Sequence, residues 1–451
     1  MNIRCVQDHV SETPLNQAAH RSTDGGTSGL RCLIVADHAS LRFGGEAALP
    51  LHYFRVLRKF REEAWLVVHE RTRDELLEHF PNDQERIHFV CDNHLHRLLW
   101  NCGRFLPRRL GYFTFGMLSR LLTQLLQRRI VRQVIAMHGI DVVHQPMPVS
   151  PREPSMLFNL RVPVIIGPMN GGMDYPPAFA DMQSRMVTWS IRAGRFFANL
   201  LNTLIPGKRR AGAILVANAR TRAALPSGIR GPVIELVENG VDLDTWRPTD
   251  DTPQDRPRRS HMTRFIYIGR LVDWKAVDIL LEAFHHVTSQ CDARLEIVGD
   301  GPEGPRLRAY AHALRLTQEQ HVQFSGFLPQ TECARRLQQS DVLVLPSLLE
   351  CGGAVVLEAM AMARPVIATN WGGPADYLDD TCGILIEPTS HNDMVRQLGA
   401  AMLRLNADPE LCRTMGEAGR RRVLREFDWD VKVRRMLDIY REVVARAHTV
   451  R

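Results

Sequence analysis

Several common features are missing from this 451-residue sequence, which has only four lysines among 57 basic residues. No stretch of about 18 apolar residues is free of charge, which argues against a transmembrane helix. The nine cysteines are odd in number and scattered without a C-x-x-C pair, which excludes a zinc ribbon or disulfide framework and indicates reduced thiols. The first 29 residues are polar and lack the apolar core of a signal peptide, so we expect a disordered leader over residues 1–29.

Acidic residues are absent from two long stretches, 93–140 and 182–234, which together carry 17 basic residues. Because the whole chain has a net charge of only +7, the remaining residues sum to −10, and the charge is strongly polarised. The cations of the two stretches are Arg97, Arg104, Arg108, Arg109, Arg120, Arg128, Arg129, Arg132, Arg185, Arg192, Arg195, Lys208, Arg209, Arg210, Arg220, Arg222 and Arg230.

Short apolar runs alternate with helix-period segments along most of the chain. The pattern predicts strands at 32–36, 64–68, 87–90, 141–144, 163–167, 213–217, 233–237, 264–268, 294–298, 321–325, 341–346, 365–369 and 384–386. It predicts helices at 276–289, 305–316, 354–363, 393–405 and 409–424. Such alternation is typical of parallel sheets covered on both faces, and thirteen strands are too many for one sheet.

We therefore predict an α/β protein with two doubly wound, Rossmann-like domains. A polar, proline-rich segment at 242–262 marks the break between them. The predicted N-terminal domain covers residues 30–245, and the second covers 246–429. An amphipathic helix at about 430–451 is expected to pack back onto the first domain.

The strand ends of the second half carry residues suited to binding phosphates and sugars, since ligands bind beyond the carboxyl ends of parallel strands. Arg270 and Lys275 follow the strand at 264–268 and could converge on a diphosphate, although a solvated loop would look the same. Asp300 lies in a glycine turn after the next strand. After 341–346 come Glu350 and then Glu358, which lies in an apolar helix where a mere surface charge is poorly explained. Free amides at the start of that helix belong to Gly352, Gly353 and Ala354.

Two further glycine-rich loops follow strands in the first half. Gly44 and Gly45 follow the first strand, but there is no G-x-G-x-x-G, which argues against a dinucleotide-dependent oxidoreductase. Asn170 and Gly171 close the strand at 163–167 with small and polar residues that face the same crevice.

Taken together, these residues resemble glycosyltransferase family 4, whose members have the GT-B fold of two Rossmann-like domains facing across a cleft. The pattern is met by Arg270 with Lys275, by Glu350 and Glu358 as an E-x7-E motif, and by Gly44-Gly45. It is met again by the segment 237–242, Val-Glu-Asn-Gly-Val-Asp. The resemblance spans about 30–435 and is strongest from 237 to 390.

The resemblance implies retaining transfer of a hexose-type sugar from a nucleotide-diphosphate sugar, with no cofactor and no metal ion. Arg270 and Lys275 would neutralise the donor diphosphate, Glu350 with the backbone of 352–354 would hold the sugar, and Glu358 the ribose. Gly45 would approach the phosphate from the other domain. Many relatives have a histidine in the loop that here reads Gly-Pro-Met-Asn-Gly-Gly, so Asn170, with Gly171, takes the acceptor-side position. Ala276 and Cys351-Gly352 also depart from the usual residues.

The basic stretches suggest where an acceptor meets the enzyme. Residues 95–135 mix arginines with large apolar residues, as in segments that dock on anionic membranes. We expect a cytoplasmic protein, peripheral on the inner face of the membrane, with 95–135 and 185–230 forming the docking face and a lipid-linked saccharide as acceptor, in bacterial-type polysaccharide or glycolipid synthesis. The alternative is that the arginines only solvate helix faces. No motif supports nucleic-acid binding. Two other functions stay open, a nucleotide-sugar epimerase of the same fold and a non-catalytic sugar-binding relative.

Overall fold

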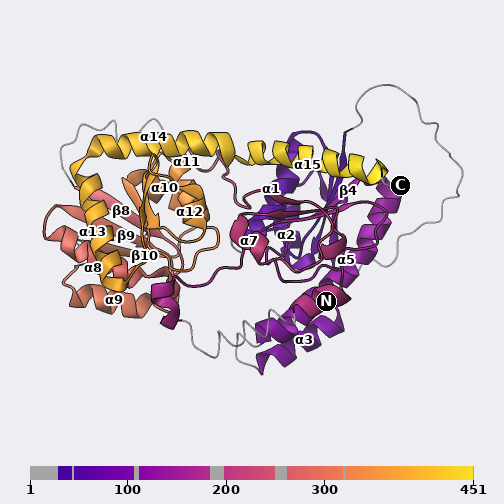
Figure 1. The fold of residues 1–451 in the computed structure, drawn as a ribbon, viewed down its shortest axis with the longest axis horizontal. Helices are drawn as coiled ribbons and strands as arrows, with labels where there is room; N and C mark the ends of the chain where they lie inside the picture. Colours follow the sequence, from indigo (N-terminus) through magenta and orange to yellow (C-terminus); the bar gives the residue numbers. More distant parts are fainter. Residues whose placement is uncertain are drawn as a thin grey trace, which may run out of the picture. The chain divides into compact units, whose positions relative to one another are not determined.

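The computed structural model describes residues 29–42, 45–105, 111–182, 198–248, 262–317 and 321–449 (Figure 1). The predicted strands are all present, in two sheets with the orders β3-β2-β1-β4-β5-β6-β7 and β10-β9-β8-β11-β12-β13. The strands are β1 Arg31–Val35, β2 Glu63–His69, β3 Ile87–Val90, β4 Val142–Gln145, β5 Val164–Met169, β6 Ala213–Val216, β7 Val233–Glu235, β8 Thr263–Ile268, β9 Ala293–Val298, β10 Val322–Gly326, β11 Val342–Leu345, β12 Val366–Thr369 and β13 Gly383–Ile386.

Helices fill the gaps between strands, and the five predicted in the second half are confirmed within a few residues. The α-helices are α1 Gly45–Lys59, α2 Arg73–His79, α3 His94–Arg104, α5 Met117–His138, α7 Ala219–Ala223, α8 Val277–Thr288, α9 Gly304–Ala313, α10 Gln330–Gln339, α11 Ala354–Ala361, α12 Gly373–Tyr377, α13 His391–Ala407, α14 Pro409–Glu426 and α15 Trp429–Thr449. A π-helical turn, Tyr112–Gly116, precedes α5, and the 3-10 turn η6 covers Asp273–Lys275.

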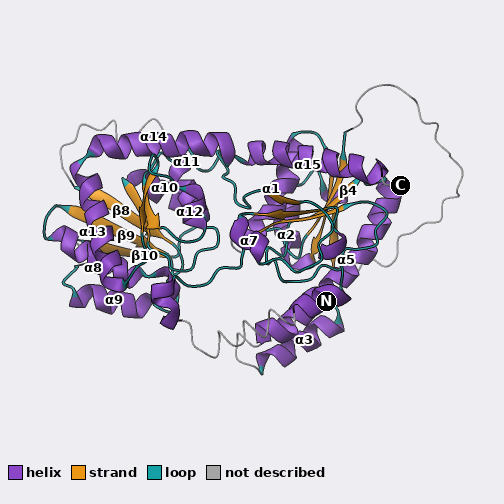
Figure 2. Ribbon diagram, in the orientation of Figure 1, coloured by secondary structure: helices purple, strands orange, loops and turns teal. Residues whose placement is uncertain are grey.

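The six-stranded sheet is a parallel sheet buried on both faces. Its central strand β11 reads Val-Leu-Val-Leu and is buried throughout, as expected where helices cover both sides. Figure 2 shows α8, α9 and α13 on one side of the sheet and α10, α11 and α12 on the other. Local sequence signals mark where α13 and α14 begin. The Ser390 side chain caps α13, and Asp408 caps α14 just before Pro409, the first residue of that helix.

The chain divides into two compact units. Unit 1 comprises residues 1–145, 155–164 and 444–451, and unit 2 comprises 146–154 and 165–443. The predicted domain limits, including the boundary at residue 245, stay a prediction. The expected leader, except for Gly29, lies outside the described residues, as do Gly44 and residues 249–261 of the expected break.

Two expected absences can be compared with the described part of the chain. None of its helices combines the length and the apolar character needed to cross a membrane. None of the eight cysteines within it forms a disulfide, and four of them are buried.

Candidate functional site

The strand order of the six-stranded sheet places a crevice at one position. The chain runs outward from β8 through β9 to β10 and outward from β11 through β12 to β13, in opposite directions. The two starting strands are parallel neighbours, with Phe265 opposite Val342. Connections that diverge in this way leave a crevice at the carboxyl ends of the two strands, where α/β proteins bind ligands. The loops after β8 and β11 carry the predicted donor residues.

The β8 and β11 loops are joined by an ion pair and by a backbone hydrogen bond. The Lys275 Nζ donates to the Glu350 Oε2, and each of the two side chains is only 15% exposed. Nearby, the Leu348 amide donates to the Trp274 carbonyl at 2.8 Å. The sequence analysis predicts that Lys275 binds the diphosphate and that Glu350 binds the sugar. The structure brings these two side chains into direct contact.

Arg270 differs from Lys275 in having an exposed side chain. Its guanidinium makes no ion pair or hydrogen bond with the residues that the structure describes, whereas its carbonyl accepts a hydrogen bond of 3.0 Å from Tyr267. The backbone is therefore fixed while the charge remains available. The loop also contacts the turn after β9, because the Leu271 amide donates to the Asp300 carbonyl at 3.0 Å. Asp300 itself is exposed, and its carboxylate accepts a hydrogen bond from the Gly301 amide at 2.7 Å.

Glycine is required where the loops after β11 and β12 meet. A Cβ on Gly352 would lie 2.3 Å from Asn239 Nδ2, and one on Gly373 would lie 1.9 Å from the Gly352 carbonyl oxygen. Gly353 precedes α11 with a φ of 80°, a left-handed conformation that favours glycine. The Gly373 amide donates to the Glu350 carbonyl at 2.8 Å. This interlocked backbone presents the start of α11, with Ala354 as its first residue, toward the crevice.

Glu358 lies on α11, two turns from Glu350. Burial of its carboxyl group raises its pKa from an ordinary 4.5 to about 8. The group has no hydrogen-bonding or ionic partner within the described residues, so it is an uncompensated acid in an apolar helix. A carboxyl group in this state can accept and donate hydrogen bonds to hydroxyl groups. This environment is not that of an ordinary charged residue on a helix surface.

Asn170 lies after β5 in a tight polar network. It is 6% exposed, and its Nδ2 donates to Glu238 Oε1 at 2.7 Å and to the Cys351 carbonyl at 2.8 Å. Its neighbour Gly171 donates from the amide to Thr221 Oγ1 at 3.1 Å. The Asn170 amide therefore uses one donor hydrogen on the segment after β7 and the other on the loop after β11. The predicted acceptor-side role of Asn170 and Gly171 stays a prediction.

Sequence reasoning missed a buried acid and a buried lysine beside this network. Glu238 is 5% exposed and Lys432 is 2% exposed. Burial raises the pKa of Glu238, and burial lowers the pKa of Lys432 to about 8. The Lys432 Nζ donates to the Val237 carbonyl. The rarity of lysine was the available signal, since a lysine kept in an arginine-rich chain suggests a special environment, but its partner is 195 positions away.

A cavity of about 360 Å³ opens beside the same loop. Its polar rim includes Arg152 and Arg220, and the guanidinium of Arg220 lies 3.5 Å from Asp376 Oδ2. Gly172, which follows Asn170 and Gly171, contributes backbone to the wall. The remaining lining residues are Ala198, Asn199, Ala223, Ala224, Leu225 and Pro226.

The cations of the two acid-free stretches lie in different environments. Arg97, Arg104, Arg129 and Arg132 are exposed, whereas Arg128 stacks over Phe158 at 4.2 Å. Lys208 was predicted to belong to a basic surface, and this prediction is wrong. Its side chain is fully buried, and its Nζ donates to the Ser150 carbonyl at 2.7 Å. Burial lowers the pKa of Lys208 to about 7. Five members of the set lie outside the described residues, namely Arg108, Arg109, Arg185, Arg192 and Arg195.

Gly45 begins α1 and is exposed, and a Cβ at this position would meet nothing within 4 Å. It belongs to unit 1, whereas the other predicted donor residues belong to unit 2. Its approach to the donor phosphate stays a prediction.

The chain is similar in sequence to known proteins. Residues 249–422 match the family described as glycosyl transferases group 1. The chain is 33% identical over 226 residues to a D-inositol 3-phosphate glycosyltransferase of Streptomyces bingchenggensis, covering 47% of this chain and 48% of that protein. It is 30% identical over 224 residues to an alpha-maltose-1-phosphate synthase of Mycolicibacterium smegmatis, covering 47% and 57%. The chain thus spans about half the length of the curated relatives it matches.

Solved structures resemble nearly the whole chain. The sucrose-phosphate synthase of Thermosynechococcus elongatus has a TM-score of 0.62 at 20% identity, covering 92% of this chain and 100% of that one. Anabaena HepE, solved in complex with UDP, has a TM-score of 0.61 at 16% identity with the same coverage. At these identities the likeness shows the fold, which is that of the GT-B glycosyltransferases with two parallel-sheet, Rossmann-like domains.

Proposed function

We propose that this protein is a retaining glycosyltransferase that moves a hexose-type sugar from a nucleotide-diphosphate sugar to a saccharide acceptor. The observation that carries the proposal is the meeting of Lys275, Glu350 and the glycine loop at the crevice between β8 and β11. The family match over 249–422 covers the same residues. Solved structures of similar fold contain UDP and UDP-glucose.

In this proposal the donor diphosphate lies between the exposed guanidinium of Arg270 and the ammonium of Lys275. When the bond from the sugar to the diphosphate breaks, its electron pair stays on the leaving phosphate oxygen, and the two cations stabilise that negative charge. The acceptor hydroxyl oxygen forms the new bond to the sugar carbon, and the hydroxyl proton passes to the leaving phosphate oxygen. The proposal assigns no cofactor and no metal ion to the donor site.

Glu350 and the backbone of residues 352–354 hold the sugar in this arrangement, and Glu358 receives the ribose hydroxyls. The ion pair with Lys275 fixes the Glu350 carboxylate before the donor arrives. A group that is already in position lowers the activation barrier, because no free energy is spent on orienting it during the reaction. The cavity beside Arg220 gives the acceptor a place next to the Asn170 loop.

A donor screen followed by a product assay tests the proposal. The purified chain is expected to melt at a higher temperature with one nucleotide-diphosphate sugar, because a ligand that binds only the folded state stabilises it. Released nucleoside diphosphate should then depend on an added saccharide or glycolipid acceptor. No stabilisation by any UDP- or GDP-sugar would contradict the proposal, and conversion of the donor sugar without an acceptor would favour an epimerase.

We further propose that α3 and the start of α5 dock on the cytoplasmic face of an anionic membrane, where a lipid-linked acceptor is presented. Large apolar side chains are exposed on α3 and just after it, with exposed fractions of 57% for Leu98, 70% for Trp100 and 89% for Phe105. Arg97 and Arg104 are exposed on the same short helix. Apolar and basic residues together are what an interfacial helix uses. A mannosyltransferase of Corynebacterium glutamicum whose name includes a phosphatidylinositol mannoside is among the relatives, at 30% identity over 223 residues.

Sedimentation with vesicles tests this docking. The protein is expected to sediment with phosphatidylglycerol vesicles and not with phosphatidylcholine vesicles, and to dissociate as salt is raised. Binding that is absent, or that is indifferent to salt, would contradict it.

A further inference from the structure

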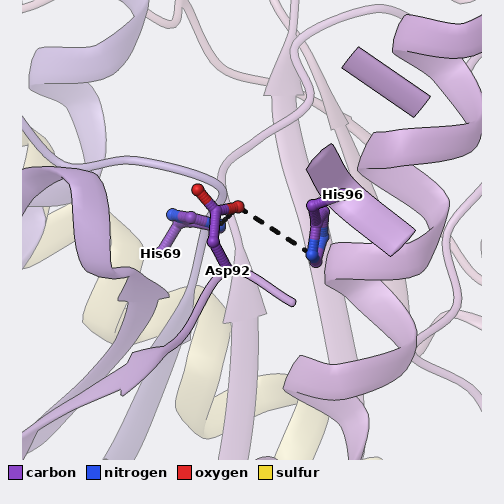
Figure 3. Close-up of side chains that lie close together, drawn as sticks. All are labelled: His69, Asp92 and His96. Carbon is purple, nitrogen blue, oxygen red and sulfur yellow. Dashed lines mark ion pairs between the residues drawn. The ribbon is translucent and has the colours of Figure 1, made fainter. Parts of the chain in front are cut away.

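Three potential metal ligands meet at the edge of the seven-stranded sheet, outside the residues assigned above. His69 ends β2, Asp92 follows β3 by two residues, and His96 lies in the first turn of α3. Because β2 and β3 are parallel neighbours with His69 opposite Val90, their carboxyl ends bring the three side chains together. One ligand atom from each residue lies within 4.8 Å of the others, as Figure 3 illustrates.

The separations approach those of a metal centre. His69 Nε2 lies 3.2 Å from Asp92 Oδ1, and His96 Nδ1 lies 3.9 Å from the same oxygen. Ligand atoms about 2.0–2.1 Å from a tetrahedral zinc ion are roughly 3.3 Å apart. The first separation already fits this value, and the second needs a shift of about half an ångström in the His96 ring. The imidazole nitrogens of His69 and His96 lie within 4.8 Å of each other, so the two rings must approach by up to about 1.5 Å to share one ion.

The His69 ring contains a polar atom that is otherwise unsatisfied. The residue is 3% exposed, and its Nε2 is buried without an aligned hydrogen-bond partner although Asp92 is close. Buried polar atoms are rarely left in this state. An ion between the three residues would satisfy the atom.

The His96 ring has the tautomer that a metal at Nδ1 requires. Its Nε2 lies 3.1 Å from Thr123 Oγ1, and that hydroxyl donates its own hydrogen to the Ser119 carbonyl at 3.1 Å. Thr123 must therefore accept from the His96 Nε2–H, which leaves a lone pair on Nδ1. A second hydrogen bond of this kind commonly orients histidines that bind metals. The Asn93 amide, 3.3 Å from Nδ1, is the group that the ion would displace.

We propose that His69, Asp92 and His96 form a binding site for a divalent transition-metal ion such as zinc. Two imidazoles and one carboxylate suit this class of ion and leave a fourth position for water.

The surrounding charges both support and oppose the ion. Glu70 adds a carboxylate that accepts from the Asp92 amide at 2.7 Å. Arg71 opposes the ion, because its Nη2 donates to Asp92 Oδ1 at 3.2 Å and its amide donates to His69 Nδ1 at 3.3 Å. Metal at Nε2 requires the proton of His69 to lie on Nδ1, so this last hydrogen bond is lost on binding. The guanidinium of Arg71 is therefore a competitor for the site.

The ion would fasten the start of α3 to the ends of β2 and β3. This is the helix that exposes Leu98 and Trp100. The site lies in unit 1 and takes no part in the donor chemistry proposed above, so failure of either proposal leaves the other standing.

Metal titration of the full-length chain tests the site. After treatment with a chelator, wild type is expected to bind one equivalent of Zn²⁺ by calorimetry, and Co²⁺ should give the visible absorption of a low-symmetry site. His69→Gln and Asp92→Asn should weaken Zn²⁺ binding by a hundredfold or more. Arg71→Gln should tighten it several-fold by removing the competing cation. His94→Gln, an exposed histidine on the same helix, is the matched control and should bind as wild type does.

Wild type that binds no stoichiometric Zn²⁺, or that binds it equally well in the Asp92→Asn variant, would overturn the proposal. Circular dichroism of each metal-free variant separates lost binding from lost folding. Asp92 is the decisive position if His69→Gln fails to fold, because its side chain is 35% exposed.

Discussion

The crevice beyond β8 and β11 and the surface of α3 use charged residues in opposite ways. In the crevice, Lys275 is paired with Glu350, and the glycines at 352 and 373 interlock with neighbouring backbone. On α3, Arg97 and Trp100 are exposed side by side with other apolar residues. The first arrangement suits a ligand of fixed shape, and the second suits a partner surface that has no fixed shape. Each can be disturbed separately.

The largest expected effect comes from Gly373→Ala, which adds a methyl group where Gly373 contacts the backbone of Gly352. The new Cβ would lie 1.9 Å from the Gly352 carbonyl oxygen, so backbone must move. We expect a loss of about 3 kcal/mol in the free energy of unfolding, as for severe overpacking, together with loss of donor binding. Denaturant unfolding measures it. Gly45→Ala is the control for stability, since its Cβ would meet nothing within 4 Å, and an equal loss there would contradict the argument.

Breaking the charge pair comes next. Lys275→Ala removes a cation from the proposed leaving group and leaves Glu350 largely buried without it, so kcat/KM should fall about 100- to 1000-fold. Steady-state kinetics with the donor found by screening measures the change. Lys59→Ala, at the exposed end of α1, is the matched control. Full activity of Lys275→Ala would exclude the assigned role.

The third prediction concerns the acid at Glu358. Its pKa of about 8 in the folded state exceeds the ordinary 4.5, so the folded chain holds a proton that the unfolded chain loses between these values. Stability is therefore expected to fall as pH rises from about 4.5 to 8, and Glu358→Gln should remove that slope. Denaturant unfolding across this pH range measures it.

Donor binding adds a second readout for the same residue. Ribose hydroxyls that donate to Glu358 favour its ionised form, so binding near pH 7 should release a proton, which calorimetry in buffers of different ionisation enthalpy detects. Glu410→Gln, an exposed acid, should behave as wild type. Proton uptake, or no proton change, would contradict the assignment.

The smallest effect is expected on α3. Each of Arg97→Gln and Arg104→Gln should weaken binding to phosphatidylglycerol vesicles about fivefold, corresponding to about 1 kcal/mol per cation near an anionic surface. Melting temperatures should not change, because both side chains are exposed. Arg396→Gln in α13 is the control. Equal effects from all three variants would mean that only the total charge matters.

Much of the fold follows from local pattern. Buried strands such as β11 are continuous apolar runs, and their ends carry the turn residues that limit them, so the strands were predicted within about two residues. The loops that hold Arg270 and Glu350 could be predicted for the same reason, since they follow such strands directly.

What could not be predicted depends on partners far along the chain. Lys208 is surrounded by arginines in sequence, yet its ammonium is enclosed against a carbonyl 58 positions away. Lys432 is likewise bonded to Val237, and His69 approaches Asp92 only through the pairing of β2 with β3. The periodicity of the sequence does not predict these long-range contacts, because they arise from tertiary packing rather than from neighbouring residues.

The few lysines of this chain have a practical consequence. Lys208 and Lys432 are enclosed, Lys275 is tied to Glu350, and only Lys59 stands at an exposed helix end. An amine-acylating reagent applied to the native protein should therefore modify Lys59 quickly and the other three slowly. The rates at which the other three lysines are acylated, measured by mass spectrometry, then report three separate events. These are local opening around Lys208, local opening around Lys432, and occupation of the crevice at Lys275.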